Sequence, residues 1–133
     1  MSSLNTFLEI LGIEDITDDQ WYEYYIDVAD EALDDMEESE WRRLLQLCTR
    51  QPARWQVLCA SALSGRDHPT AVAILETLLV SNEPEVAITS AESLDYVDTW
   101  SPREDHSRAL RSLQDKIAPG RTETINRLLS RNI

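Results

Sequence analysis

The chain has 133 residues, of which 42% are hydrophobic and 28% charged, and this composition is typical of one globular domain rather than of a disordered segment. Its formal net charge of −13 argues against direct binding of nucleic acid or anionic lipid, because both ligands require a basic surface. The first ten residues, MSSLNTFLEI, lack the basic and apolar regions of a signal peptide, and no window approaches the roughly 20 apolar residues of a membrane span. We therefore expect a cytoplasmic protein whose two cysteines are reduced.

The negative charge is concentrated at the N-terminal end of the sequence. Residues 1–41 contain fourteen carboxylates and no Lys or Arg, whereas residues 42–133 contain eleven carboxylates and twelve basic side chains. The first part therefore has a charge of −14 and the second a charge of +1. A charge distribution of this kind favours a basic protein as the partner of the N-terminal part.

Helix signals recur along the whole chain, and strand signals do not. The first strong helix start is ITDDQW, where Thr17 and Gln20 can form a capping box and Ile16 and Trp21 a hydrophobic staple. The periodicity and the breaks predict helices at residues 4–11, 18–37, 40–49, 53–64, 69–80, 84–97, 103–117 and 121–130.

Two later starts involve the two histidines. His68 precedes Pro69 and is expected at the start of the helix 69–80. In SPREDH, the pattern favours Ser101 as the N-cap and Glu104 as its capping-box partner.

The predicted helix 18–37 is strongly amphipathic. At 100° per residue its apolar stripe contains Trp21, Tyr25, Val28, Ala29, Ala32 and Met36, and its opposite face is acidic. Like-charged pairs four residues apart destabilise a free helix by about 0.2–0.5 kcal/mol each, so a cationic surface would relieve them. The residues that we expect to contact a partner are Asp19, Tyr22, Glu23, Tyr24, Asp27, Asp30, Glu31, Asp34, Asp35, Glu37 and Glu38.

Two simpler explanations of this acidic face remain open. The carboxylates can form a solvated face that keeps the protein soluble. Alternatively, basic side chains that follow in the sequence can fold back and neutralise part of the face, namely Arg42, Arg43, Arg50 and Arg54.

The sequence shows no pattern of catalytic or metal-binding residues. His68 and His106 do not lie in a metal-ligand motif, and the solvated carboxylates lack the apolar pocket that separates the pKa values of a catalytic pair. Cys48 and Cys59 lie in helical, apolar contexts and are expected in the core. We expect a protein that is not an enzyme and binds no cofactor or metal.

An internal repeat appears when the segment that begins at Trp41 is placed on the segment that begins at Val72. Eight apolar or small residues then match, pairing Trp41 with Val72, Leu44 with Leu75, Leu47 with Leu78, Cys48 with Leu79, Trp55 with Val86, Val57 with Ile88, Ala60 with Ala91 and Leu63 with Leu94. Such helix pairs bury their apolar faces by stacking on neighbouring pairs.

The segment 71–97, AVAILETLLVSNEPEVAITSAESLDYV, resembles a short HEAT-like repeat, with Leu78, Leu79, Pro84, Val86, Ala91 and Leu94 at the family's positions. Ala87 stands where these repeats often carry an arginine. The resemblance implies an all-α fold of stacked antiparallel helix hairpins, a right-handed α-solenoid of about seven or eight helices. It implies one domain, 1–133, with acidic N-terminal helices in 1–40, two HEAT-like pairs in 41–97 and a C-terminal pair in 98–133.

In composition, the acidic helix with its tyrosines resembles the binding element of bacterial toxin-immunity proteins, both colicin-type and those of contact-dependent growth inhibition. This resemblance implies an inhibitor that neutralises a basic cognate toxin, such as a nuclease. Two alternatives stay open. One is a nucleic-acid mimic that inhibits a DNA-binding protein, and the other is a HEAT-like adaptor that binds through its concave face and its arginines.

Overall fold

The computed structural model describes residues 2–131, and these residues form helices and loops without a strand. Residues 18–34 are one continuous helical segment of three parts, so that the described residues contain eight helical segments, as predicted. The elements are α1 (Ser3–Leu11), α2 (Asp18–Gln20), the π-helical turn η1 (Trp21–Tyr25), α3 (Ile26–Asp34), α4 (Glu38–Cys48), α5 (Ala53–Ala62), α6 (Pro69–Leu79), α7 (Pro84–Asp95), α8 (Glu104–Gln114), the 3₁₀ turn η2 (Pro119–Arg121) and α9 (Thr122–Ser130).

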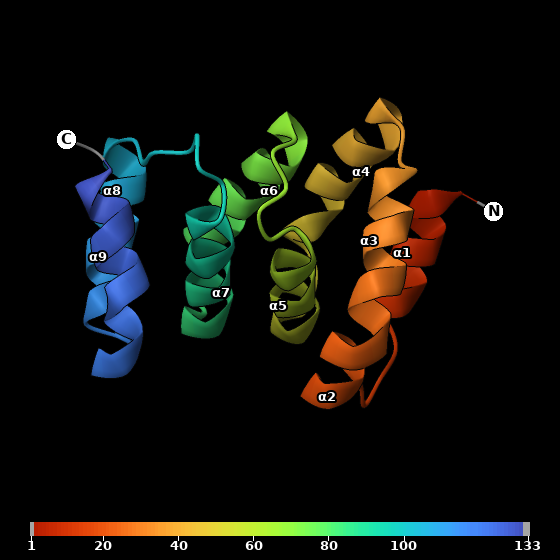
Figure 1. Ribbon diagram of the computed structural model, residues 1–133, viewed down its shortest axis with the longest axis horizontal. Helices are drawn as coiled ribbons and strands as arrows, with labels where there is room; N and C mark the ends of the chain where they lie inside the picture. The colour runs from red at the N-terminus through yellow and green to blue at the C-terminus, as the bar shows by residue number, and fades with distance from the viewer. Residues whose placement is uncertain (1, 132–133) are drawn as a thin grey trace.

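The helices follow one another from one end of the molecule to the other (Figure 1). Helix α3 contacts α5, α5 contacts α7 and α7 contacts α9, while α4 contacts α6 and α6 contacts α8. Helices α1 and α3 pack on each other at the N-terminal end, and α8 and α9 do so at the C-terminal end. Each helix between these ends therefore has a neighbour on either side.

The repeat in the sequence is also a repeat in the structure. Helix α4 begins at Glu38 and α6 at Pro69, and the same offset along the chain separates the ends of these two helices and the starts of α5 and α7. In five of the eight matched pairs both residues are buried, and Leu44 and its counterpart Leu75 are fully buried. The repeated apolar positions in the sequence therefore correspond to the buried positions of two successive helix pairs, α4–α5 and α6–α7.

The start of the acidic helix agrees with its sequence signals. Thr17 accepts a hydrogen bond from the backbone N–H of Gln20 at 3.1 Å, and the Gln20 side chain accepts from the N–H of Thr17 at 3.0 Å. Ile16 and Trp21 are both buried beside this box. The helix nevertheless contains a π turn and ends at Asp34, before the predicted end at residue 37.

The start of α8 differs from its prediction. Arg103, rather than Ser101, is the N-cap, and its backbone N–H donates to Nδ1 of His106 at 3.2 Å. His106 is 2% exposed, packs against Trp100 and lies 3.8 Å from the Glu76 carboxylate. Burial of the imidazole fixes the cap at Arg103, which overrides the local preference for Ser101.

One hydrophobic core runs through the described residues from Leu4 to Leu128. Its buried polar groups are bonded across neighbouring helices, since Ser93 Oγ donates to the Ala60 carbonyl at 2.7 Å and Trp100 Nε1 donates to Glu76 at 2.9 Å. No buried side-chain nitrogen or oxygen of the described residues lacks a partner. The core is thus satisfied internally, and candidate binding groups lie on the surface.

Candidate protein-binding surface

The acidic segment, residues 18–35, comprises α2, η1, α3 and the C-capping residue Asp35. It packs against α1 and α5, and Trp21 anchors it by donating from Nε1 to Ser61 Oγ at 3.1 Å. The π turn over Trp21–Tyr25 inserts extra backbone into the helix, and such turns are frequent at functional sites. The segment is therefore fixed on one side by the core and presents its other side to solvent.

One row of carboxylates on this segment is free. Its members recur every fourth residue, are exposed, and make no ion pair with any residue in the range 2–131. We call this set the free row, and it consists of Asp19, Glu23, Asp27, Glu31 and Asp35.

A second group of carboxylates, on the segment and just beyond it, is paired with residues distant in sequence. Arg66, whose side chain is only 18% exposed, pairs with Asp30 and, at 2.8 Å, with Asp34. His68 Nε2 lies 3.1 Å from Glu38, just beyond the segment. The paired and free carboxylates thus form two separate sets.

The alternative in which nearby arginines neutralise the acidic face applies to one of the four. Arg54 reaches Asp18 at 3.5 Å, but Arg42, Arg43 and Arg50 form no ion pair within the described residues. These three side chains lie on α4 and just after it, and Arg42 instead donates to the Glu38 carbonyl at 3.4 Å. The neutralising arginine is Arg66, which follows α5 and reaches α3 because α3 and α5 are in contact.

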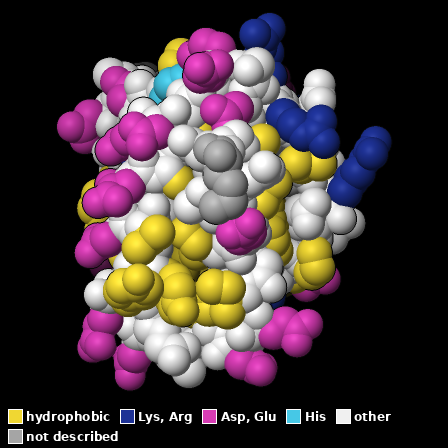
Figure 2. Space-filling model, turned by 90° about the vertical axis from the view of Figure 1, so that its right-hand side faces the viewer, with side chains coloured by type: hydrophobic (Ala, Val, Ile, Leu, Met, Phe, Trp, Pro, Cys, Tyr) yellow, Lys and Arg dark blue, Asp and Glu magenta, His cyan; other side chains and the backbone are white. Residues whose placement is uncertain are grey.

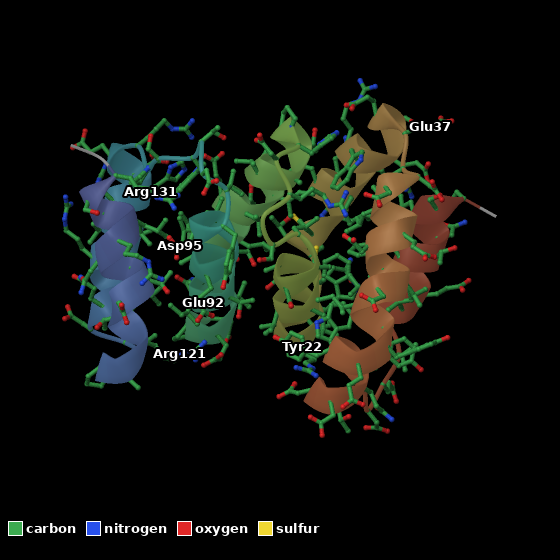
Figure 3. The ribbon with its side chains drawn as sticks, viewed as in Figure 1. Tyr22, Glu37, Glu92, Asp95, Arg121 and Arg131 are labelled. Atoms are coloured by element: carbon green, nitrogen blue, oxygen red, sulfur yellow. The ribbon has the colours of Figure 1, made fainter. Side chains whose placement is uncertain are left out.

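Glu37, which follows the segment and is labelled near its upper end in Figure 3, has a local structural role. Its backbone N–H donates to Glu40 Oε1 at 3.2 Å, and the N–H of Glu40 donates to the Glu37 carbonyl at 3.0 Å, at the start of α4. It is exposed but already holds a helix end. Of the predicted contact residues, Glu37 and Glu38 therefore differ from the free row.

The ion pairs reduce the like-charge repulsion around Asp30 and Asp34 but leave that of the free row. Arg66 bridges Asp30 and Asp34, and α3 ends at Asp34, so that Glu38 lies on the next helix. The last four members of the free row still repel one another at successive i,i+4 positions. These three pairs together cost about 1 kcal/mol at low ionic strength.

The two predicted contact tyrosines are both exposed, but they face different neighbours. Tyr22 is 64% exposed and lies toward α5, at the lower part of the view in Figure 3. Tyr24 is 62% exposed and contacts Tyr25 edge-on, with 4.9 Å between ring centroids. An aromatic side chain beside carboxylates is typical of an interface anchor, and here each tyrosine serves a different part of the surface.

A groove that the sequence did not predict lies beside Tyr22, across α5 and α7. Two adjoining hollows form it, and we call it the α5–α7 groove; their lining includes Tyr22, Ile26, Ser61, Thr89, Glu92 and Tyr96. Arg121 at one side donates to Glu85 at 2.8 Å and to Glu92 at 3.3 Å, and Figure 3 shows it close to α7. A polar floor of Ser and Thr gives no periodicity from which this groove could have been inferred.

The charges are segregated on the N-terminal end of the molecule. Figure 2 shows carboxylates gathered along one side of this end and basic side chains on the other, with hydrophobic side chains between them. On this face, carboxylates are most numerous on the side opposite the basic side chains.

The described residues contain no group of His, Cys, Asp or Glu that could hold a metal ion. Cys48 and Cys59 are buried and unpaired, and desolvation raises the pKa of both thiols, which disfavours the thiolate needed for nucleophilic chemistry. His68 and His106 each accept a backbone hydrogen bond at a helix start through Nδ1. Nothing in these contacts assembles a nucleophile, a base and an orienting group.

Among residues 2–131, no helix has the length and apolarity needed to cross a membrane. Comparison with known proteins found no matching family model, no matching curated protein and no matching solved structure.

Proposed function

We propose that this chain is a cytoplasmic immunity-type inhibitor that binds a basic cognate toxin, a nuclease, and blocks it without itself being an enzyme. The observation that supports the proposal is the free row, in which five exposed carboxylates recur on one helical segment without a neutralising cation among residues 2–131. Nuclease surfaces are basic because they bind phosphates, so the free row has the complementary charge.

The electrostatics suit rapid capture of such a toxin. Carboxylates held on a packed helix steer a basic partner toward one orientation and raise the association rate. Contact then removes the repulsion of about 1 kcal/mol within the free row and adds ion pairs. Tyr22 and Tyr24 supply exposed aromatic area next to these charges.

The helix contacts support a finer description of the fold, which we also propose. Contacts of α3 with α5, α5 with α7, α4 with α6 and α6 with α8 are those of stacked antiparallel hairpins. We infer a HEAT-like, right-handed α-solenoid in which the acidic segment belongs to the first pair. In such an array the acidic segment is presented at an end rather than between repeats.

The direct test is protection from a nuclease toxin domain, sought first among the genes that neighbour this one. The chain is co-expressed with that domain, and survival is compared for wild type and the variant E23K/D27K/E31K. The matched control, D98K/E104K/D115K, makes the same charge change at exposed carboxylates that form no ion pair among the described residues. We expect protection to be lost only in the first variant, and equal protection by both variants would refute the proposal.

Salt dependence gives a second readout with purified proteins. Because the Debye length falls from about 10 Å at 0.1 M salt to about 3 Å at 1 M, binding through the free row weakens steeply over this range. Affinity that is independent of salt would contradict a mechanism based on these carboxylates.

The α5–α7 groove favours a second candidate, a HEAT-like adaptor that binds a partner segment in this groove. Tyr22 and Tyr96 stand exposed beside it, and Tyr96 is 72% exposed. An adaptor of this kind would bind equally well after reversal of the free row and would lose binding in Tyr96→Ser. The regular spacing of the free row is also what a nucleic-acid mimic requires, and a mimic would inhibit several unrelated DNA-binding proteins rather than one toxin.

A further inference from the structure

The two ends of the molecule have different surfaces. On α8 and α9 every exposed residue is polar or charged, namely Glu104, Asp105, Arg108, Arg111, Ser112, Glu123, Asn126, Arg127 and Ser130. At the other end, hydrophobic side chains gather on the surface, as Figure 2 shows. The end residues of a helical stack are normally polar, and the N-terminal end departs from this at Tyr24, a large side chain that is 62% exposed.

The hydrophobic residues of this end come from α1, η1 and α3. Tyr24 is 62% exposed, and Leu8, Tyr25 and Val28 are partly buried against the core. We call these four residues the end face. An exposed aromatic side chain beside partly buried apolar ones and near carboxylates is typical of a protein-binding site.

A hollow between α1 and α3 adjoins the end face. Its lining residues are Ser3 and Thr6 of α1 and Val28, Glu31, Ala32 and Asp35 at α3. The small side chains leave room for an apolar group from a partner. Glu31 and Asp35 belong to the free row, so a cation beside that apolar group would meet two unpaired carboxylates.

We propose that the end face and this hollow are the docking site for a basic amphipathic helix of the partner protein. The apolar side of that helix packs on α1 and α3, and its Lys and Arg side chains lie against the free row. A helix fits because two packed helices present a groove to a third, and each helix pair inside the stack is covered in this way. The inference rests on the proposed function and specifies the structural element of the toxin that is bound.

Charge favours a basic helix over two other possible occupants, a second copy of this chain and an anionic membrane. A second copy placed by two-fold symmetry would bring the two free rows toward each other, and each copy has a net charge of −13. An anionic membrane would be repelled by the same carboxylates. A basic helix is attracted by them and covers the apolar side chains at the same time.

The test uses synthetic helical peptides as probes and the full chain as the receptor. One peptide carries leucine on one face and lysine on the other, and two controls of equal length replace leucine by serine or lysine by glutamate. Affinity is measured by fluorescence anisotropy, and the bound surface is mapped by amide chemical shifts of the wild-type protein. We expect the leucine–lysine peptide to bind at least about tenfold more tightly than either control, because a buried apolar face contributes more than about 1.4 kcal/mol.

Two receptor variants locate the site. Tyr24→Ser removes an exposed anchor, and Thr6→Phe fills the hollow; each is expected to weaken the leucine–lysine peptide by about tenfold. Tyr96→Ser removes a similarly exposed tyrosine in the α5–α7 groove and is expected to leave the affinity unchanged. The shift mapping uses unmodified protein, so it decides the question even where a variant folds poorly.

Several outcomes would overturn the docking site. With the peptides, these are equal affinities for the serine–lysine and leucine–lysine peptides, chemical-shift changes confined to the α5–α7 groove, or no binding of any peptide. A dimer of the free chain in light scattering, or binding of the chain to phosphatidylserine vesicles, would also overturn it. If lysine peptides bind regardless of leucine and the free-row amide variant E23Q/D27N/E31Q abolishes this, the proposed acidic surface stands and the end face is wrong. If that variant changes nothing, the proposed function fails as well.

Discussion

Arg66 offers the most direct test of how the charges of the acidic segment are organised. Its guanidinium bridges Asp30 and Asp34, and its side chain is 18% exposed while the two carboxylates are 59% and 63% exposed. Exposed ion pairs contribute about 0.2–1 kcal/mol each, and the partial burial of Arg66 favours the upper part of this range. Removing the bridge also restores a like-charge pair worth about 0.2–0.5 kcal/mol. We therefore expect Arg66→Ala to reduce the free energy of unfolding by about 1.5 kcal/mol.

The assay is thermal and urea unfolding followed by circular dichroism. For a chain of this size, a loss of this magnitude lowers Tm by about 6 °C. Arg42→Ala is the matched control, since Arg42 is exposed and forms no ion pair within the described residues. The Arg66→Ala effect should shrink below about 0.5 kcal/mol in a D30N/D34N background, because the partners are then neutral. An Arg66→Ala effect no larger than that of Arg42→Ala would refute this account of the segment.

Three further predictions concern the anchor, the thiols and the free row. Trp21→Phe, which removes the bond to Ser61, is expected to destabilise by about 1–2 kcal/mol in urea unfolding, and an effect below about 0.3 kcal/mol would contradict the anchoring role. Both buried cysteines, whose thiol pKa is raised, should react with a thiol reagent only at the rate of unfolding; rapid labelling of native protein would show that they are accessible. Replacing the three central carboxylates of the free row by amides should stabilise the chain by up to about 1 kcal/mol at low salt and by less at high salt, whereas destabilisation would show that the row supports the fold.

Most of the fold could be predicted because it depends on local signals and on periodicity. The helix starts at Thr17, His68 and Pro84 follow from capping residues and proline, and the internal repeat follows from core positions that recur. The α8 start was mispredicted because the buried His106 side chain accepts the capping bond there. Propensity at Ser101 could not reveal a contact that depends on the packing of His106 against other parts of the chain.

The candidate surface was predicted less completely, for a physical reason. The sequence shows which side chains are charged but not which of them meet a distant arginine. Arg66 is far along the chain from Asp30 and Asp34, and only the contact between α3 and α5 brings them together. The π turn and the α5–α7 groove likewise depend on backbone and packing rather than on a residue pattern.

The unpaired basic side chains of the described residues lie on or next to other helices than that of the free row. Six basic residues are exposed and form no ion pair with any described residue, namely Arg42, Arg43, Arg50, Arg108, Arg111 and Lys116. Helices α4 and α8 carry most of them, and these helices belong to the row α4, α6 and α8 rather than to the row that begins with α3. The fold thus contains enough positive charge to neutralise the free row and holds it on other helices. The carboxylates of the free row therefore repel one another by about 1 kcal/mol on a segment that the core holds in place. Under the proposed function, binding of a basic partner would remove this repulsion.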